Sequence, residues 1–184
     1  MKELSLNILD ITENSVKANS SLTVITLEQK GNKLTVTIAD NGCGMPDEVV
    51  RSVTDPFYTT RTTRKVGLGL PLLKLAAEQT GGGIKIISKH IDEFPNEHGT
   101  TVSAEFYTDH IDFTPLGDII ATVTTLIQGH PDTDFLFSHT TETGTVLLDT
   151  RQLREILEGV PLNSYEVIKW IEEYLREQYE NPTE

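Results

Sequence analysis

The chain has 184 residues and a formal net charge of -13 at pH 7, and hydrophobic residues make up 37% of it. This composition suits one domain of ordinary size, with or without a small addition, and it is too apolar for a disordered chain. The acidic balance argues against general nucleic-acid binding, and the single cysteine excludes an internal disulfide. No stretch approaches the roughly 20 apolar residues of a membrane span, and no signal-peptide pattern opens the chain, so we expect a cytoplasmic protein with no membrane contact.

The first forty residues predict a helix followed by a β-hairpin. Apolar or small side chains recur with a helical period over residues 4–18. Residues 21–29 and 33–40 alternate and are rich in β-branched residues, and Gly31-Asn32 between them predicts a tight turn. A short helix is expected over residues 47–53, after Pro46.

The middle of the chain predicts one more helix and two more strands. The stretch "GLGLPLLKLAAEQTGG" has a proline near its start and glycines at its end, which is typical of a helix with defined boundaries. Residues 83–90 and 99–107 are predicted strands, joined by a polar loop.

The pattern changes after about residue 109. We expect a helix over residues 116–127, a hairpin formed by residues 133–140 and 144–150, and helices over residues 152–158 and 165–178. The prediction is therefore two regions, residues 1–108 and a small α/β extension of residues 109–184. Whether the extension continues the first sheet or packs separately stays open, and so does whether the last helix packs on its own domain or docks a partner.

Three polar side chains share one face of the first helix. Asp10, Asn14 and Lys17 are spaced four and three residues apart. An amide oxygen suits Mg²⁺, an ammonium pairs with phosphate, and a carboxylate can orient or deprotonate water. The alternative is the solvent-facing side of an amphipathic helix.

The string "DNGCGM" places an acid at the end of a strand. Gly42 and Gly44 permit close approaches that other side chains forbid, and Asp40 can accept a hydrogen bond from an amino group such as that of adenine. The alternative is an ordinary turn, because Asp-Asn-Gly is a common turn sequence.

A basic segment without acidic residues follows, over residues 56–77. Within this segment, Gly67 and Gly69 come directly before a predicted helix. The free N–H groups at the start of that helix can bind phosphate. The alternative is a glycine hinge beside a solvated loop. The basic residues of this segment are Arg61, Arg64, Lys65 and Lys74.

Taken in order, these segments resemble the ATP-binding domain of the GHKL superfamily, which includes gyrase, ninety-kilodalton chaperones, mismatch-repair ATPases and histidine kinases. "DITENSVKA" resembles the N box, "DNGCGM" the first glycine box, "DPFYTTR" the phenylalanine box of histidine kinases, "GLGLPLLKLAAEQTGGGIKI" the second glycine box, and "HGTTVSAEF" the last Gly-Thr box. The resemblance covers residues 4–107. It implies an α/β (α+β) two-layer sandwich of the Bergerat type, in which helices face a mixed, mainly antiparallel sheet.

The resemblance also implies roles for single residues. Asp40 would take the adenine amino group with Thr101 near the base, Asn14 would hold Mg²⁺, and Lys17 would contact phosphate. Asp10 stands where hydrolytic members carry a longer glutamate, so it would be the candidate general base. Residues 47–66 would form a lid that orders around ATP. The other implied nucleotide-binding residues are Gly42, Gly44, Arg61, Lys65, Gly67, Leu68, Gly69 and Leu70.

Sensor histidine kinases carry a phosphoacceptor histidine upstream of the N box, where this sequence has only about ten residues, so we expect the catalytic half without its substrate half. The five histidines all follow the glycine box at residue 40 and are expected on the surface or in loops. Two functions are compatible with this: transfer of the γ-phosphoryl group from Mg·ATP to a separate, unidentified partner protein, or ATP-gated binding of a partner with slow or no hydrolysis. A homodimer is possible in either.

Overall fold

A computed structural model of the chain describes residues 2–55 and 68–183. The first part contains, in chain order, α1 (Leu4–Lys17), β1 (Leu22–Lys30), β2 (Lys33–Asp40), α2 (Asp47–Val50), α3 (Gly69–Gln79), β3 (Gly83–Lys89) and β4 (Gly99–Tyr107). The second part contains α4 (Ile119–Gly129), β5 (Asp134–Thr141), β6 (Gly144–Asp149), α5 (Thr150–Leu157) and α6 (Tyr165–Glu180).

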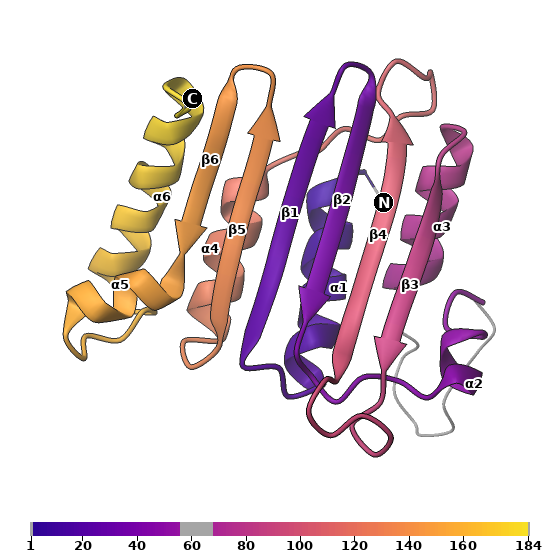
Figure 1. Cartoon of the computed structure of the whole chain (residues 1–184). Coiled ribbons are helices and arrows are strands. Elements are labelled where there is room, and N and C mark those ends of the chain that lie inside the picture. The colour runs from indigo at the N-terminus through magenta and orange to yellow at the C-terminus, as the bar shows by residue number, and fades with distance from the viewer. Residues whose placement is uncertain (1, 56–67, 184) are drawn as a thin grey trace.

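Six strands form one sheet in the order β3-β4-β2-β1-β5-β6 (Figure 1). All neighbours pair antiparallel except β1 and β5, which are parallel. The residues after 109 thus continue the first sheet: β5 pairs along β1 from Leu22↔Asp134 to Glu28↔Thr140. This settles the question that the sequence left open. The mixed, mainly antiparallel sheet of the expected fold class is confirmed.

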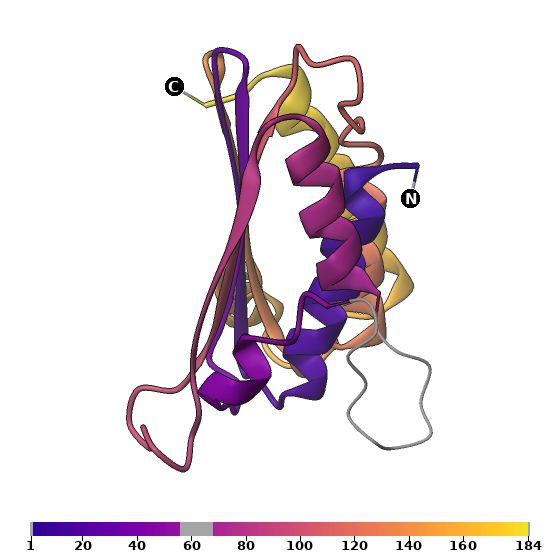
Figure 2. The same cartoon turned by 90° about the vertical axis from the view of Figure 1, so that its right-hand side faces the viewer.

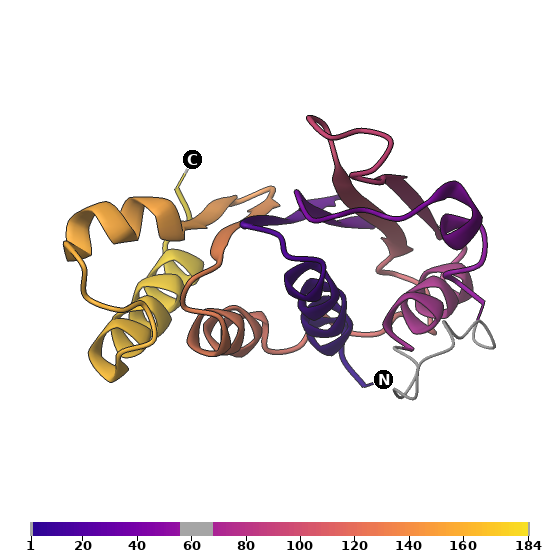
Figure 3. The ribbon, with the colours of Figure 1, turned by 90° about the horizontal axis from the view of Figure 1, so that it is seen from below.

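Helices cover one face of the sheet. Figures 2 and 3 show α3, α1, α4 and α6 side by side in a single layer, while no helix of the described residues covers the opposite face. Side chains alternate accordingly: Ile25 and Leu27 on β1 and Val36 and Ile38 on β2 are buried toward the helices, and the residues between them are only partly buried. The period-2 pattern that predicted these strands therefore marks the helix-facing side.

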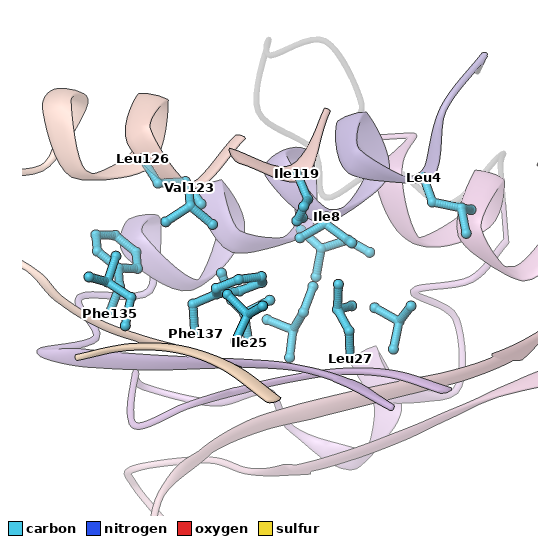
Figure 4. Close-up of a cluster of buried hydrophobic side chains, with 14 of the residues drawn as sticks. Leu4, Ile8, Ile25, Leu27, Ile119, Val123, Leu126, Phe135 and Phe137 are labelled. Carbon is cyan, nitrogen blue, oxygen red and sulfur yellow. The ribbon is translucent and has the colours of Figure 1, made fainter. Parts of the chain in front are cut away.

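One hydrophobic core runs from the early residues into the late ones. Figure 4 shows Ile8 of α1 and Val123 and Leu126 of α4 above Phe137 of β5 and Ile25 of β1, with Leu4 further along α1 at one end of the cluster. Each of these side chains is at most 1% exposed, and burying one contributes roughly 1.5–3 kcal/mol. The C-terminal residues are therefore part of the main core.

The start of α1 is also held by the later chain. The backbone N–H groups of Leu4 and Ser5 donate to the carbonyl oxygens of Pro115 and Leu116, at 2.9 and 2.8 Å. These N–H groups have no partner inside the helix. Thr122 of α4 adds a hydroxyl hydrogen bond to the Ser5 carbonyl at 3.1 Å. The orientation of α1 is thus fixed by the segment that leads into α4.

The predicted elements are all present, with boundaries shifted by up to a few residues. The helix expected over residues 47–53 ends at Val50 and continues as turns, and the helix expected from residue 116 begins at Ile119, after an Asp118 side chain that accepts from the Ala121 N–H. The stretch Lys33–Asp40 and the Gly31-Asn32 turn are confirmed. Among the described residues, no helix combines the length and the apolar character that crossing a membrane requires.

Candidate nucleotide site

A row of polar side chains crosses three strands at one end of the sheet. Asp40 at the end of β2 is paired in register with Thr100 of β4, and Thr100 is paired with Ser88 of β3. Asp40 and Thr100 share the parity of the buried, helix-facing residues on their strands, and Ser88 shares that of Ile84 and Ile86, which are partly buried against the core. The hydroxyls of Ser88 and Thr100 lie 2.8 Å apart. The row therefore faces the helix layer.

Both oxygens of the Asp40 carboxylate accept hydrogen bonds. Its Oδ2 accepts from the Ser15 hydroxyl of α1 at 2.7 Å, and its Oδ1 accepts from the backbone N–H groups of Gly42 at 2.9 Å and Thr100 at 3.3 Å. A carboxylate has about four acceptor positions. Oδ2, with one described donor, keeps capacity for another. The side chain is thus held in one orientation by α1, β4 and its own turn, and it can still receive a ligand donor.

Thr101, which the resemblance placed near the base, lies on the other face of β4. Val102, Ala104 and Phe106 of this strand are buried toward the helices. Thr100 is in phase with them, whereas Thr101 alternates with them. Thr101 is paired with Ala39 and Ile87. The structure therefore brings Thr100, and not Thr101, to the Asp40 carboxylate.

The turn after Asp40 packs closely on α1 and β3. The Cys43 N–H donates to the Ala18 carbonyl at the end of α1 at 2.9 Å. His98 Nδ1 donates to the Gly42 carbonyl at 2.6 Å, which assigns the ring proton to Nδ1. Gly44 has φ +68°, and a Cβ there would lie 1.9 Å from the Lys89 carbonyl oxygen. Only glycine fits this turn without moving the backbone.

The Asp10 side chain lies against the first residue of α3. A Cβ built on Gly69 would be 2.8 Å from Asp10 Oδ2, so the carboxylate packs where a larger residue would collide with it. Leu68 precedes the helix as an exposed residue, and Leu70 is buried in the core. The first turn of α3 has free N–H groups that favour negative charge nearby. Asp10 and Gly69 thus meet where an anion is electrostatically favoured.

Asn14 and Lys17 lie one and two turns further along α1, and both are exposed. Among the described residues, Lys17 takes part in no salt bridge, whereas Lys74 pairs with Glu78 at 3.9 Å. Asn14 and Lys17 are therefore free to contact a ligand on the face that begins at Asp10. A carboxylate, an amide oxygen and an ammonium in this order fit a metal-phosphate group chemically.

Part of the expected site lies outside the described residues. Arg61, Lys65 and Gly67, and the segment 56–66 of the expected lid, belong to this part. Of the lid, the structure describes α2 and the turns that follow it. The Met45 N–H, just before α2, donates to the Ser88 hydroxyl at 2.7 Å. The start of the lid segment is therefore tied to the same polar row as Asp40.

Sequence reasoning missed Ser15, Ser88, His98 and Thr100. Strand parity could have found two of them: Thr100 is in phase with the apolar residues of its strand, and Ser88 follows Ile84 and Ile86 at the same two-residue spacing. His98 was included in the expectation that all five histidines are surface or loop residues. That expectation was wrong for His139, which is 6% exposed and lies within β5.

Comparison with known proteins gives a consistent result. The family model for "Histidine kinase-, DNA gyrase B-, and HSP90-like ATPase" matches residues 2–110. Among curated proteins, the signal transduction histidine-protein kinase AtoS of Escherichia coli is 30% identical over 88 residues, which cover 48% of this chain and 14% of AtoS. Sporulation kinase C of Bacillus subtilis is 29% identical over 91 residues, which cover 48% of this chain and 20% of that kinase. The matched region is thus a small part of each relative.

Among solved structures, the N-terminal domain of a DNA repair protein has a TM-score of 0.57 at 18% identity. It covers 81% of this chain and 53% of that one. This share is larger than residues 2–110 alone can supply, so the similarity of fold extends into the C-terminal residues.

Proposed function

The chain belongs to the family of histidine kinase-, DNA gyrase B- and HSP90-like ATPases, and we propose that it binds Mg·ATP and transfers the γ-phosphoryl group to a separate partner protein. The family assignment supports ATP binding and kinase-type chemistry in general. The observation that carries the proposal for this chain is the Asp40 carboxylate, oriented by Ser15 and Thr100 and retaining an acceptor position. A fixed carboxylate in a row of hydroxyls suits the donor edge of a purine.

The positions of the described side chains support the following roles. The Asp40 carboxylate accepts a hydrogen bond from the exocyclic amino group of adenine. Thr100, in place of Thr101, lies next to Asp40. Asn14 supplies an amide oxygen to Mg²⁺ together with phosphate oxygens, and Lys17 pairs with a phosphate. Bound Mg²⁺ would neutralise charge on the phosphate oxygens. We assign Gly69 to the phosphate end of the site because it begins α3 beside Asp10, and we assign Arg61 and Lys65 to the same phosphates from the sequence alone.

The proposed transfer is a single displacement. A nucleophilic atom of the partner's acceptor side chain forms a bond to the γ-phosphorus with its lone pair. The bond from that phosphorus to the β–γ bridging oxygen breaks, its electrons go to ADP, and the acceptor loses its proton to solvent or to a nearby base. The protein contributes position and charge, which carry most of the catalysis in this type of reaction.

One observation favours a second function, ATP-gated binding with slow turnover. Asp10 is the residue best placed to activate water, and its carboxylate packs against Gly69 at the start of α3. A carboxylate held against the protein is less available as a base. In this alternative, the ATP-bound form of the protein binds a partner and the free form does not.

Incubation of the protein with γ-labelled ATP and Mg²⁺, alone and with each protein encoded by neighbouring genes, tests the proposal. Label on a neighbour supports the kinase, and it should disappear with Asp40→Asn. Release of free phosphate without labelled protein indicates a hydrolase. ATP retained with neither result favours the gated binder. Calorimetry that finds no adenine-nucleotide binding with Mg²⁺ present rules out all three.

A further inference from the structure

An apolar groove lies between α5 and α6, at the β6 end of the sheet. Figures 1 and 3 place these helices at the opposite end of the molecule from α2 and α3, and so far from the candidate nucleotide site. The groove has a volume of about 310 Å³, which is at the small end of the range for ligand pockets. The residues that line it are Leu153, Leu157, Val160, Ser164, Glu166, Val167 and Trp170.

Large apolar side chains remain exposed around this groove. Trp170 is 48% exposed and Val160 50% exposed, and Ile156 and Tyr165 nearby in the chain are exposed to 76% and 80%. Trp170 stacks on Tyr174 with ring centroids 4.9 Å apart and an interplanar angle of 13°, so one wall is already ordered. Exposed aromatic residues beside a preformed apolar groove are typical of an interaction surface.

The surroundings of the groove are acidic. Residues 149–180 contain eight acidic and four basic residues. Two of the basic ones, Arg151 and Arg154, are paired with Asp149 and Asp134 at 2.8 and 2.7 Å. Glu166 lines the groove, and with Glu173 it lies four residues before and three residues after Trp170, on the same side of α6. The apolar wall is therefore bordered by carboxylates.

This charge selects among possible occupants. A second copy of the chain would bring another net charge of -13 and the same acidic rim, so association with itself is opposed by repulsion. An added strand is also disfavoured, because the outer edge of β6 is already occupied. The Gln178 side chain bonds both the N–H and the carbonyl of Leu147 at 2.9 Å, and the Thr145 N–H donates to the Thr183 carbonyl at 2.8 Å.

We propose that the α5–α6 groove docks a basic amphipathic helix of a partner protein. One or two apolar side chains of that helix enter the groove against Trp170, and its lysines or arginines face Glu166 and Glu173. This is the helix-in-groove mode of recognition, in which apolar anchors spaced three or four residues apart supply affinity and the charged rim supplies selectivity. The proposal does not depend on nucleotide binding, since no residue of the groove belongs to the nucleotide site.

Trp170 is the only tryptophan of the chain, so its emission reports directly on the groove. The probe is a leucine/lysine amphipathic peptide of about 18 residues, long enough to form a helix on binding, without tryptophan or tyrosine. A peptide with glutamate at every lysine position is the matched control. The lysine peptide should shift the Trp170 emission saturably to shorter wavelength and bind at least tenfold more tightly than the glutamate peptide. Its affinity should fall when the salt concentration rises to ~1 M.

Two pairs of exposed substitutions localise the effect, and circular dichroism checks that each variant is folded. Glu166→Lys should weaken the lysine peptide at least fivefold, whereas Glu93→Lys, with the same change of charge in a distant loop, should leave its affinity unchanged. Val160→Asn should also weaken binding, and Ile111→Asn, at a 94% exposed position elsewhere, should not.

Three outcomes would overturn the proposal: no change in Trp170 emission with the lysine peptide, equal affinity for both peptides, or a dimer in sedimentation equilibrium that Trp170→Ala dissociates, since the groove would then belong to a second copy. Repeating the titration with and without Mg·ATP separates this test from that of the proposed function. Peptide binding by a chain that ignores ATP would leave the docking proposal intact while removing the kinase.

Discussion

The Ser15 hydroxyl of α1 donates a 2.7 Å hydrogen bond to Asp40 Oδ2 at the end of β2. This contact joins the helix that carries Asn14 and Lys17 to the strand end that carries the carboxylate. Because α1 is held at its other end by the carbonyls of Pro115 and Leu116, its face has a fixed position relative to Asp40. Hydrogen bonds to a charged group contribute about 1.5–3 kcal/mol, enough to keep the carboxylate in one rotamer.

Replacing Asp40 by asparagine should abolish ATP binding in the concentration range of the wild type. The change keeps the size of the side chain and removes one of its two acceptor oxygens and the charge, so the adenine amino group loses its partner. A loss of about 1.5–3 kcal/mol corresponds to roughly 10- to 150-fold in affinity. Titration calorimetry measures it, with Asp132→Asn, at an exposed aspartate, as control. Unchanged ATP affinity in Asp40→Asn would remove Asp40 from the site.

Thr100→Val should weaken ATP binding about fivefold, whereas Thr101→Val should not. Both changes replace a hydroxyl by a methyl group in the same strand. Only Thr100 shares the helix-facing side with Asp40, and a neutral hydrogen bond contributes about 1 kcal/mol. Fluorescent-nucleotide displacement compares the two variants. A larger loss for Thr101→Val would reverse our assignment in favour of the residue first expected from the sequence.

Asn14→Ala should remove the Mg²⁺-dependent part of ATP affinity and leave the Mg²⁺-free part. The amide oxygen is the proposed protein ligand of the ion, and alanine at an exposed helix position does not disturb packing. Binding measured with Mg²⁺ and again after chelation with EDTA gives the two parts. Asn96→Ala, in the exposed loop between β3 and β4, should behave as wild type. Full Mg²⁺-dependent turnover in Asn14→Ala would contradict the proposed role.

Gly44→Ala should destabilise the fold much more than Gly31→Ala. Both glycines have positive φ, +68° and +56°, but a Cβ at Gly44 meets the Lys89 carbonyl at 1.9 Å, while a Cβ at Gly31 meets nothing within 4 Å. The strain of positive φ alone costs roughly 1 kcal/mol, and the collision adds to it at Gly44. Urea unfolding gives both free energies of unfolding, and similar values would mean that the turn is less constrained than described.

Stability should fall as the pH is lowered from 7 toward 5.5, and His139 should contribute to this fall. Burial lowers the pKa of the His139 imidazole below its ordinary value of 6.5, so the folded state holds the ring neutral while the unfolded state gains a proton. The stability that the neutral His139 ring contributes is present in full above pH 6.5. It is lost as the pH falls toward the lower pKa of the folded state. Nδ1 lies 2.8 Å from the Tyr179 hydroxyl, whose own pKa burial raises.

Urea unfolding at several pH values checks this prediction. His139→Gln should be less stable at pH 8, because it disturbs the buried contact between β5 and α6, but its stability should depend less on pH than that of the wild type. His110→Gln, at a more exposed histidine, should keep the wild-type slope. A wild-type slope in His139→Gln would mean that other groups account for the pH dependence.

Local patterns in the sequence were sufficient for the elements and for much of the site. The helical period of apolar residues that begins with Leu4 and Ile8 predicted α1. The alternation of apolar and polar residues that ends at Asp40 predicted β2. Both succeed because short-range periodicity reports which side of an element is buried. The parallel pairing of β5 with β1 was not predictable in this way, because strands of similar pattern can occupy several positions in a sheet. The sequence favoured Thr101 over Thr100 for a different reason: a motif gives spacing along the chain, whereas the side of a strand follows from parity with Val102 and Ala104.

Strand β1 pairs with β2 on one side and with β5 on the other. The region that matches the family therefore depends on residues that lie beyond it. Residues 2–110 match the family by themselves, but removal of everything after them would uncover the hydrogen-bonding edge of β1, strip the apolar sides of Ile25 and Leu27, and leave the first amides of α1 without acceptors. An exposed apolar strand edge invites aggregation. We therefore expect the shortened chain to be insoluble. The end of the family match, at residue 110, then lies inside one cooperative folding unit.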